Sequence, residues 1–254
     1  MVDATHALDE VVVSGMTGNT KLRDTPSPFV VIGSAALEQT LSANIIHSLT
    51  RQSGISEVST GISISKPVIR GLGYNRVVLI NNGIRQEGQQ WGDEHGIEID
   101  EYSVGSVEIL KGPASLMYGS DAMAGVLVMR PFAIAPDSSH NLYISMEYQT
   151  NNGLIGGSAR YSARRNHLFW QVLGSGKIAH EYKNAGNGYV IGSGFREIDL
   201  SGYIGWLDDW GSSRMTISHY HLQPGMIDSV SAAYNGSHSY PLSLPFQRVD
   251  HTSI

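Results

Sequence analysis

The sequence predicts an α+β domain followed by antiparallel β-strands of an incomplete transmembrane β-barrel. Two observations lead to this fold class: short β-branched runs around one helical segment before residue 131, and longer alternating runs after residue 140. The composition agrees, because 16% of the residues are charged and 29 of the 254 are glycine. Ordinary soluble domains carry about 25% charged residues, so a β protein with one face against something other than water is indicated.

The first half of the chain has the pattern of a small α+β unit. Four runs rich in β-branched residues end at turn residues and predict strands at 11–15, 29–33, 77–83 and 107–110. Asn82-Gly83 is a strong turn signal. Between these strands, residues 34–54 carry apolar residues at helical spacing, and Ser34 can cap this helix while Gly54 can end it.

The second half has the pattern of membrane-spanning strands. Residues 141–149, 167–179, 198–207 and 214–222 alternate along their length and carry aromatic side chains near their ends. Strands of about 10 residues with this alternation are typical of outer-membrane β-barrels. A soluble β-sandwich is the alternative, but its strands are usually shorter.

These patterns divide the chain into segments. We expect an N-terminal segment at 1–14, the α+β domain at 15–131, a linker at 132–140, about five barrel strands at 141–222 and a long loop at 223–254. About five strands cannot close a barrel. We therefore expect a truncated chain whose open strand edges can pair with other copies. The first residues lack the basic and apolar regions of a signal peptide.

The composition also excludes several classes of function. A net charge of −6 provides no basic surface for nucleic acid. The absence of cysteine excludes disulfides, thiolate metal sites and a cysteine nucleophile. We expect no enzyme, because the sequence contains no nucleophile elbow, phosphate-binding loop or supported pair of catalytic carboxylates.

Two stretches carry a resemblance to a known family. The sequences PVIRGLGYNRVVLINNGIRQ (67–86) and VEILKGPASLMYGSDAMAGVLVM (107–129) resemble the plug domain of TonB-dependent outer-membrane receptors. The chain departs from the family pattern at Ala124, where the family has glycine, and at the INNG turn, 80–83. The resemblance implies a plug that blocks the lumen of a barrel in the bacterial outer membrane.

The resemblance also implies structural roles for single residues. Gly112 and Pro113 are expected to make a sharp corner, and Gly119 and Gly125 to allow close backbone approach. Basic residues at the positions of Arg70 and Lys111 face acidic residues of the barrel wall in the family, which implies buried ion pairs; the alternative is that both are solvated surface cations. The acidic partners are expected late in the barrel, beyond the strands of this chain.

The segment DEVVVS, residues 9–14, resembles the energy-coupling segment of these receptors. Such a segment can add as a strand to an exposed sheet edge of TonB. The residues expected to contact TonB are Asp9, Glu10, Val11, Val12 and Val13. The alternative is that this run is only the first strand of the plug.

The most acidic window, residues 85–101, contains the expected ligand contacts. They are Gln89, Gln90, Trp91, Asp93, Glu94 and His95. Asp93 and His95 offer oxygen and imidazole ligands that suit Zn²⁺ or Cu²⁺, whereas the glutamines and the tryptophan suit an organic chelate. His219 and His221 are a second metal candidate, because residues i and i+2 share one face of a strand. The alternative for this pair is an interfacial band of histidine and tyrosine.

We therefore expect a non-enzymatic receptor fragment that takes up a metal ion, a metallophore or siderophore, or haem. The metal or iron chelate is then a transported ligand. The expected partners are TonB, outer-membrane lipid and the ligand, without nucleic acid. Two alternatives stay open: a receptor of the same family for oligosaccharides, and a structural or adhesive β-protein with a plug-like module.

Overall fold

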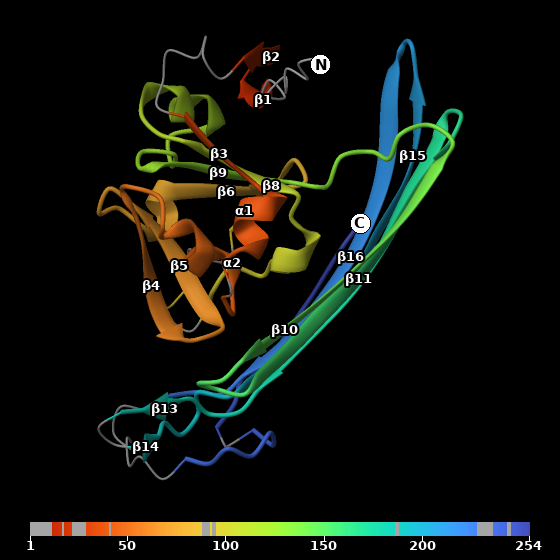
Figure 1. Cartoon of the computed structure of the whole chain (residues 1–254). Coiled ribbons are helices and arrows are strands. Elements are labelled where there is room, and N and C mark those ends of the chain that lie inside the picture. The colour runs from red at the N-terminus through yellow and green to blue at the C-terminus, as the bar shows by residue number, and fades with distance from the viewer. Residues whose placement is uncertain are drawn as a thin grey trace, which may run out of the picture.

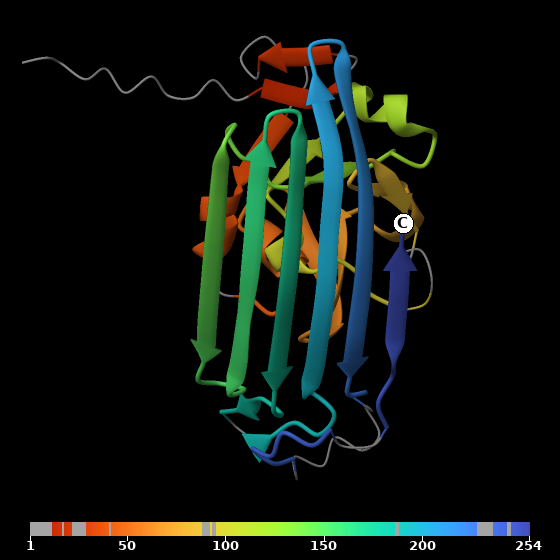
Figure 2. The same ribbon diagram turned by 90° about the vertical axis from the view of Figure 1, so that its right-hand side faces the viewer.

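The computed structural model describes residues 12–16, 18–21, 29–40, 42–87, 92, 95–185, 188–227, 236–242 and 245–254. It consists of an N-terminal domain that lies against one face of a large antiparallel sheet, as Figure 1 and the turned view in Figure 2 show. Among the described residues, no helix is both long and apolar enough to cross a membrane.

A mixed five-stranded sheet forms the centre of the N-terminal domain. Its order is β3-β8-β9-β6-β7, and only the β6–β9 pair is parallel. The strands are β3 (Phe29–Gly33), β6 (Val77–Asn81), β7 (Ile84–Gln86), β8 (Ser106–Leu110) and β9 (Gly125–Arg130). Ile46, Leu79, Ile109 and Leu127 are fully buried in its main core cluster. The predicted turn at Asn82-Gly83 joins β6 to β7, and both residues have positive φ.

Shorter elements surround this sheet. They are β1 (Val12–Met16), β2 (Gly18–Lys21), α1 (Ser34–Glu38), α2 (Ile45–Leu49), β4 (Ile55–Gly61), β5 (Ile64–Ile69) and 3₁₀-helices at Tyr74–Arg76, Glu101–Ser103 and Pro113–Tyr118. β1 pairs with β2, and β4 pairs with β5, as separate two-stranded sheets.

The helix predicted over residues 34–54 is wrong in its extent, because the structure has two short helices there. The Asn44 side chain accepts the His47 N–H at 3.0 Å and so caps α2, while the Ser42 hydroxyl donates to the Asn44 carbonyl at 2.7 Å. These local bonds compete with a continuous helix. Ser34 is not the predicted cap either, since it is the first residue of α1 and follows Gly33 at the cap position.

Six antiparallel strands form what we call the wall sheet, in the order β10-β11-β12-β15-β16-β17. They are β10 (Ser139–Gln149), β11 (Leu154–Arg165), β12 (Leu168–Ala179), β15 (Phe195–Asp208), β16 (Gly211–Pro224) and β17 (Val249–Ser253). A small hairpin of β13 (Lys183–Asn184) and β14 (Gly188–Tyr189) lies between β12 and β15.

The loop predicted for residues 223–254 is wrong at Val249–Ser253, which pairs with β16 as β17. Five residues are too few to show alternation in the sequence. The strand is held instead by non-local contacts: the Asp250 carboxylate lies 2.6 Å from the His221 ring nitrogen, and Val249 packs against a core cluster.

The two faces of the wall sheet differ in polarity. Apolar side chains such as Ile144, Leu200 and Met215 point away from the N-terminal domain and are 63%, 58% and 62% exposed. Gln171 and Glu197 point towards the domain and are buried. A soluble sandwich requires the opposite arrangement, so that alternative is wrong, and the outer face has the character of a surface in lipid.

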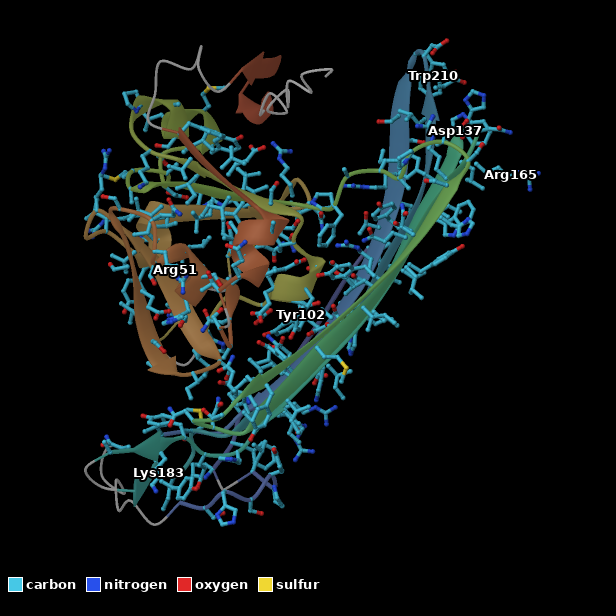
Figure 3. The ribbon with its side chains drawn as sticks, in the orientation of Figure 1. Arg51, Tyr102, Asp137, Arg165, Lys183 and Trp210 are labelled. Carbon is cyan, nitrogen blue, oxygen red and sulfur yellow. The ribbon has the colours of Figure 1, made fainter. Side chains whose placement is uncertain are left out.

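The two ends of the wall sheet also differ. Two-residue turns join β11 to β12 and β15 to β16, whereas the connections 180–194 and 225–248 at the other end are longer. Figure 3 labels Arg165 and Trp210 at the short-turn end and Lys183 at the opposite end. β1 and β2 lie on the side of the short-turn end (Figure 1).

The stretch 107–129 owes its shape to two glycines. Gly112 has a φ of 87° and leads directly into the 3₁₀-helix that begins at Pro113, which confirms the predicted corner. Gly125 has a φ of 151°, and a Cβ atom placed there would lie 2.6 Å from the Leu110 carbonyl oxygen. The close backbone approach predicted at Gly125 is therefore confirmed, whereas the one predicted at Gly119 is wrong, because a Cβ atom there would meet only the Arg85 side chain, at 3.8 Å.

We expect Gly125→Ala to lower the free energy of unfolding by about 2–4 kcal/mol, because it adds both backbone strain and a clash in a packed core. The measurement is urea denaturation of the chain in detergent micelles, followed by circular dichroism. Gly61→Ala in β4 is the control, since a Cβ atom there meets no atom within 4 Å. Equal midpoints for the two variants would contradict the prediction.

Candidate functional site

A polar contact joins the N-terminal domain to the inner face of the wall sheet, at the place where Figure 3 labels Tyr102. We call it the interface cluster, and its members are Asp100, Glu101, Tyr102, Glu147, Ser175, Lys177, Glu197, Asp199 and Tyr220. Asp100 precedes the 3₁₀-helix Glu101–Ser103, and its carboxylate accepts the Tyr102 N–H at 2.9 Å. This cap fixes the turn that presents the domain's side of the contact.

Strand register assembles the wall's side of the cluster. Lys177 on β12 is the direct cross-strand partner of Glu197 on β15, and Ser175 is the partner of Asp199. Asp199 in turn lies opposite Tyr220 on β16. Residues i and i+2 share one face of a strand, so these five side chains form one patch on the inner face.

Lys177 is the central cation of the cluster. Its side chain is 2% exposed, and its ammonium lies 3.2 Å from Glu101 Oε1 and 2.9 Å from Glu197 Oε1. It also donates to the backbone carbonyl of Ala43 at 3.2 Å, just before α2. A single wall residue therefore holds two separate segments of the N-terminal domain.

Hydroxyl groups complete the contact. The Ser175 hydroxyl donates to Asp100 Oδ2 at 2.7 Å, the Tyr102 hydroxyl donates to Glu147 Oε1 at 2.7 Å, and the Tyr220 hydroxyl donates to Glu197 Oε2 at 3.2 Å. Outside the cluster, Glu98 contacts His251 of β17 at 2.7 Å. The domain is thus bound to β10, β12 and β17 mainly through polar groups.

The acids of the cluster outnumber its bases. Burial raises the pKa of Glu101 to about 8, although Lys177 acts in the opposite direction. Burial likewise raises the pKa of Asp100 to about 6, against the effects of Lys177 and the Ser175 hydroxyl. A raised pKa means that the buried charged form is disfavoured, so the site has a demand for positive charge that Lys177 alone does not meet.

Most of the predicted ligand and TonB contacts lie outside the described residues: Asp9, Glu10, Val11, Gln89, Gln90, Trp91, Asp93 and Glu94. The backbone of Val12 and Val13 pairs with Lys21 and Thr20 of β2. His95 is half-buried, and its backbone N–H donates to the Gly92 carbonyl at 3.1 Å.

His219 and His221 share one face of β16, as their spacing predicts, but this is the outer face of the wall sheet. The ring of His219 contacts the Thr252 hydroxyl at 2.9 Å, and that of His221 contacts Asp250 at 2.6 Å. The structure therefore does not bring this pair together with His95 of the N-terminal domain.

Arg70 and Lys111 lie beside Gly54 in the N-terminal domain. The buried Lys111 ammonium donates to the Ser53 carbonyl at 2.6 Å. Burial, together with the neighbouring Arg70, lowers the pKa of Lys111. In the described part of the chain neither side chain has a carboxylate within salt-bridge distance, so their ion pairs with a barrel wall stay a prediction.

The sequence did not single out the wall residues of the cluster. A signal was present, because the pairs Ser175/Lys177 and Glu197/Asp199 alternate with residues of the apolar outer face, such as Ile198. Ionisable groups at the inward positions of two predicted strands indicate a polar contact inside a barrel. Their register, and hence their partners, could not be derived from that pattern.

A domain seated on the polar inner face of a sheet with an apolar outer face defines a class of protein, the plugged transmembrane barrel. Residues 21–126 match the family model "TonB-dependent Receptor Plug Domain". Residues 21–126 are therefore a plug domain of this kind, and the strands that follow have the fold of part of the barrel in such receptors.

Two relatives match the plug. The "Hemin receptor" of Yersinia pestis is 34% identical over 125 residues, which are 48% of this chain and 18% of that protein. The "Iron-regulated outer membrane virulence protein" of Vibrio cholerae serotype O1 is 27% identical over 156 residues, which are 59% of this chain and 24% of that protein. The chain thus spans no more than a quarter of either relative's length.

A solved structure shares the fold. The "Copper transporter OprC" superposes with a TM-score of 0.68 at 17% identity, over 79% of this chain and 31% of that one. At this identity the likeness concerns the fold: a plug and an open portion of a barrel. The N-terminal domain is accordingly called the plug below.

We expect Lys177→Met to lower the free energy of unfolding by about 3–5 kcal/mol, because it leaves Glu101 and Glu197 buried without their cation. Urea denaturation of the chain in micelles measures the loss, and hydrogen exchange over residues 97–104 reports whether the plug detaches. Lys183→Met, on an exposed lysine, is the control. Unchanged stability of Lys177→Met would show that the ion pairs do not hold the plug.

Proposed function

We propose that this chain contains the plug and first wall strands of a receptor that imports a metal ion, a metallophore or siderophore, or haem with energy supplied through TonB. The observation that carries the proposal is the polar seat of the plug on a wall sheet with an apolar outer face. The names of the relatives agree with it, since they denote a hemin receptor, an iron-regulated outer-membrane protein and a copper transporter.

The chemistry of the seat suits a plug that moves. Its contacts are ion pairs and hydrogen bonds, such as those of Lys177 and Tyr102, rather than a continuous apolar interface. Water can replace polar contacts of this kind at modest net cost. A plug with an apolar seat would instead expose that surface each time it opened.

The β1–β2 pair supports a role for residues 9–13 in coupling to TonB. β1 has five residues and β2 has four, and an isolated two-stranded hairpin is marginally stable at best. Within the described residues β1 pairs with β2 alone, which leaves its other edge for a partner strand. The pair also lies at the short-turn end (Figure 1), and short turns of outer-membrane barrels face the periplasm.

We expect Val12→Pro to weaken binding of the chain to the periplasmic domain of TonB at least tenfold, or about 1.4 kcal/mol, because proline removes a backbone donor from the added strand. Val12→Thr is the matched control, since it keeps the backbone N–H and a β-branched side chain. Biolayer interferometry with the chain in micelles makes the measurement. Wild-type affinity of Val12→Pro would remove this segment from the coupling site.

The ligand contacts are proposed at residues 89–95, with Asp93 and His95 as metal ligands and His219 with His221 as a separate candidate. Arg70 and Lys111 are proposed to meet acidic groups of a barrel wall, because both lie close together without a carboxylate partner in the described residues.

Lipid is the proposed surrounding of the outer face of the wall sheet. The free edges of β10 and β17 support self-association of this chain.

We expect calorimetric titration of the chain, carried out separately with Zn²⁺, Cu²⁺, a ferric siderophore and haemin, to show saturable binding of one of these four ligands. An Asp93→Ala/His95→Ala variant loses that binding if these residues bind a metal. His238→Ala, on a histidine remote in sequence from both candidates, serves as the control. Binding that the double variant leaves unchanged would remove residues 93–95 from the ligand site.

A further inference from the structure

Three buried carboxylates meet where the plug contacts the wall sheet. One carboxylate oxygen each from Asp100, Glu197 and Asp199 lies within 4.8 Å of the other two. The residues are 5%, 3% and 5% exposed. Asp100 comes from the plug, whereas Glu197 and Asp199 come from β15, so the group spans the two parts of the molecule.

The side chains around this group do not offset its negative charge. Lys177 is the nearby ammonium, and it already contacts Glu101 and Glu197 at 3.2 and 2.9 Å. Asp100 and Asp199 have no basic group within salt-bridge distance in the described part of the chain. Buried carboxylates are paired, coordinate metals or take up protons in stable structures, so the group requires further positive charge from a cation or from protons.

The hydrogen bonding of the Asp199 carboxylate also favours a bound cation, independently of the charge count. Its Oδ1 accepts a hydrogen bond from the backbone N–H of His221 at 3.3 Å. Its Oδ2 is buried and accepts no hydrogen bond from an N–H or hydroxyl group of the described residues, and the polar side chain that it meets is the carboxyl group of Glu197. An unpaired buried acceptor is unfavourable and calls for an explanation, and a bound cation supplies one.

There is also space for an ion beside two of the three carboxylates, those of Asp100 and Asp199. A cavity of about 50 Å³ is lined by Asp100, Asp199, Gln171, Tyr203, Ser218 and Tyr220. A single water requires about 10–15 Å³ on the same measure. The cavity can therefore hold an ion together with a water ligand, and amide and hydroxyl oxygens lie in its walls.

We propose that Asp100, Glu197 and Asp199 bind one hard divalent cation of the Ca²⁺ type, which bridges the plug to the wall sheet. The donors are oxygens without nitrogen or sulfur, the set that favours Ca²⁺ over Zn²⁺ or Cu²⁺. Ca²⁺–oxygen distances of about 2.3–2.6 Å allow two ligand oxygens to lie up to about 5 Å apart. Mg²⁺ demands a tighter octahedral shell of about 2.0–2.1 Å, so this open group of carboxylates suits it less well.

Such an ion cross-links two parts that otherwise meet through hydrogen bonds, the ion pairs of Lys177, the Glu98–His251 contact and a small apolar cluster at Ala43. Its loss leaves the plug turn at residues 97–104 less firmly held to β15. The site is separate from residues 89–95, and its occupancy is independent of which ligand the receptor transports.

The test uses the chain in detergent micelles, freed of metal with a chelator and titrated with Ca²⁺ or Mg²⁺. We expect Ca²⁺ to raise the melting temperature saturably, by about 5–10 °C at a hundredfold excess over its dissociation constant, and to slow hydrogen exchange over residues 97–104. Mg²⁺ is expected to act more weakly. Tb³⁺ luminescence sensitised by Tyr203 and Tyr220 reports occupancy directly.

Asp199→Asn should abolish the Ca²⁺ response. If Asp199→Asn does not fold, Asp100→Asn serves the same purpose. Asp209→Asn, at an exposed turn, should keep the full response. A melting temperature of the wild type that does not change with Ca²⁺ would overturn the proposal in favour of protons shared among the acids. A response that survives in Asp199→Asn or Asp100→Asn, or one that Mg²⁺ matches, would overturn the assigned residues or the assigned ion. Neither TonB nor the transported ligand takes part in this test.

Discussion

The contact between the plug and the wall sheet depends on burying the Lys177 ammonium among carboxylates. Lys177 projects inward from β12 and lies directly opposite Glu197, so a slip of β12 by one residue would turn Lys177 to the apolar outer face and leave Glu197 without its cation. The ion pair and the outer apolar stripe therefore specify the same register. A buried ion pair adds little net stability over apolar packing, yet breaking it is costly. Its effect here is to fix one arrangement of the plug.

The inverted polarity of the wall sheet constrains the plug as well. The inner face carries buried polar residues such as Gln171 and Ser158, and its apolar contact with the plug is a small cluster that includes Ala43 of the plug and Phe195 of β15. The plug must bury its own apolar residues, and it does so around its five-stranded sheet. The charged and hydroxyl-bearing part that it presents to the wall is mainly the short turn Asp100–Tyr102, with Glu98 and the Ala43 carbonyl beside it. Its folding is in this way separate from its seating, which is the property a movable plug requires.

The sequence predicted the features that rest on local pattern. The alternation in residues 141–149 and 198–207 predicted membrane-spanning strands with two unlike faces, and the Gly112-Pro113 step predicted its corner. Features that rest on non-local contacts were missed: β17 is held by β16, and the interface cluster needs the register of Lys177 against Glu197 across a long connection. The helical period of residues 34–54 was real, but capping by Asn44 divided it. Asp100 and Glu101 stood out as acidic, although nothing local indicated that they turn towards the wall.

Charges of opposite sign lie at the two ends of one plug strand. β8 begins shortly after the acidic turn at Asp100–Glu101 and ends just before Lys111, which lies beside Arg70. The acidic end is matched by a lysine of the first wall strands, whereas the basic end has no carboxylate partner in the described residues. A plug charged in this way fits a wall with a base on one side and acids on the other. Its orientation in a lumen is then set by charge as well as by shape, because a reversed plug would oppose like charges at both contacts.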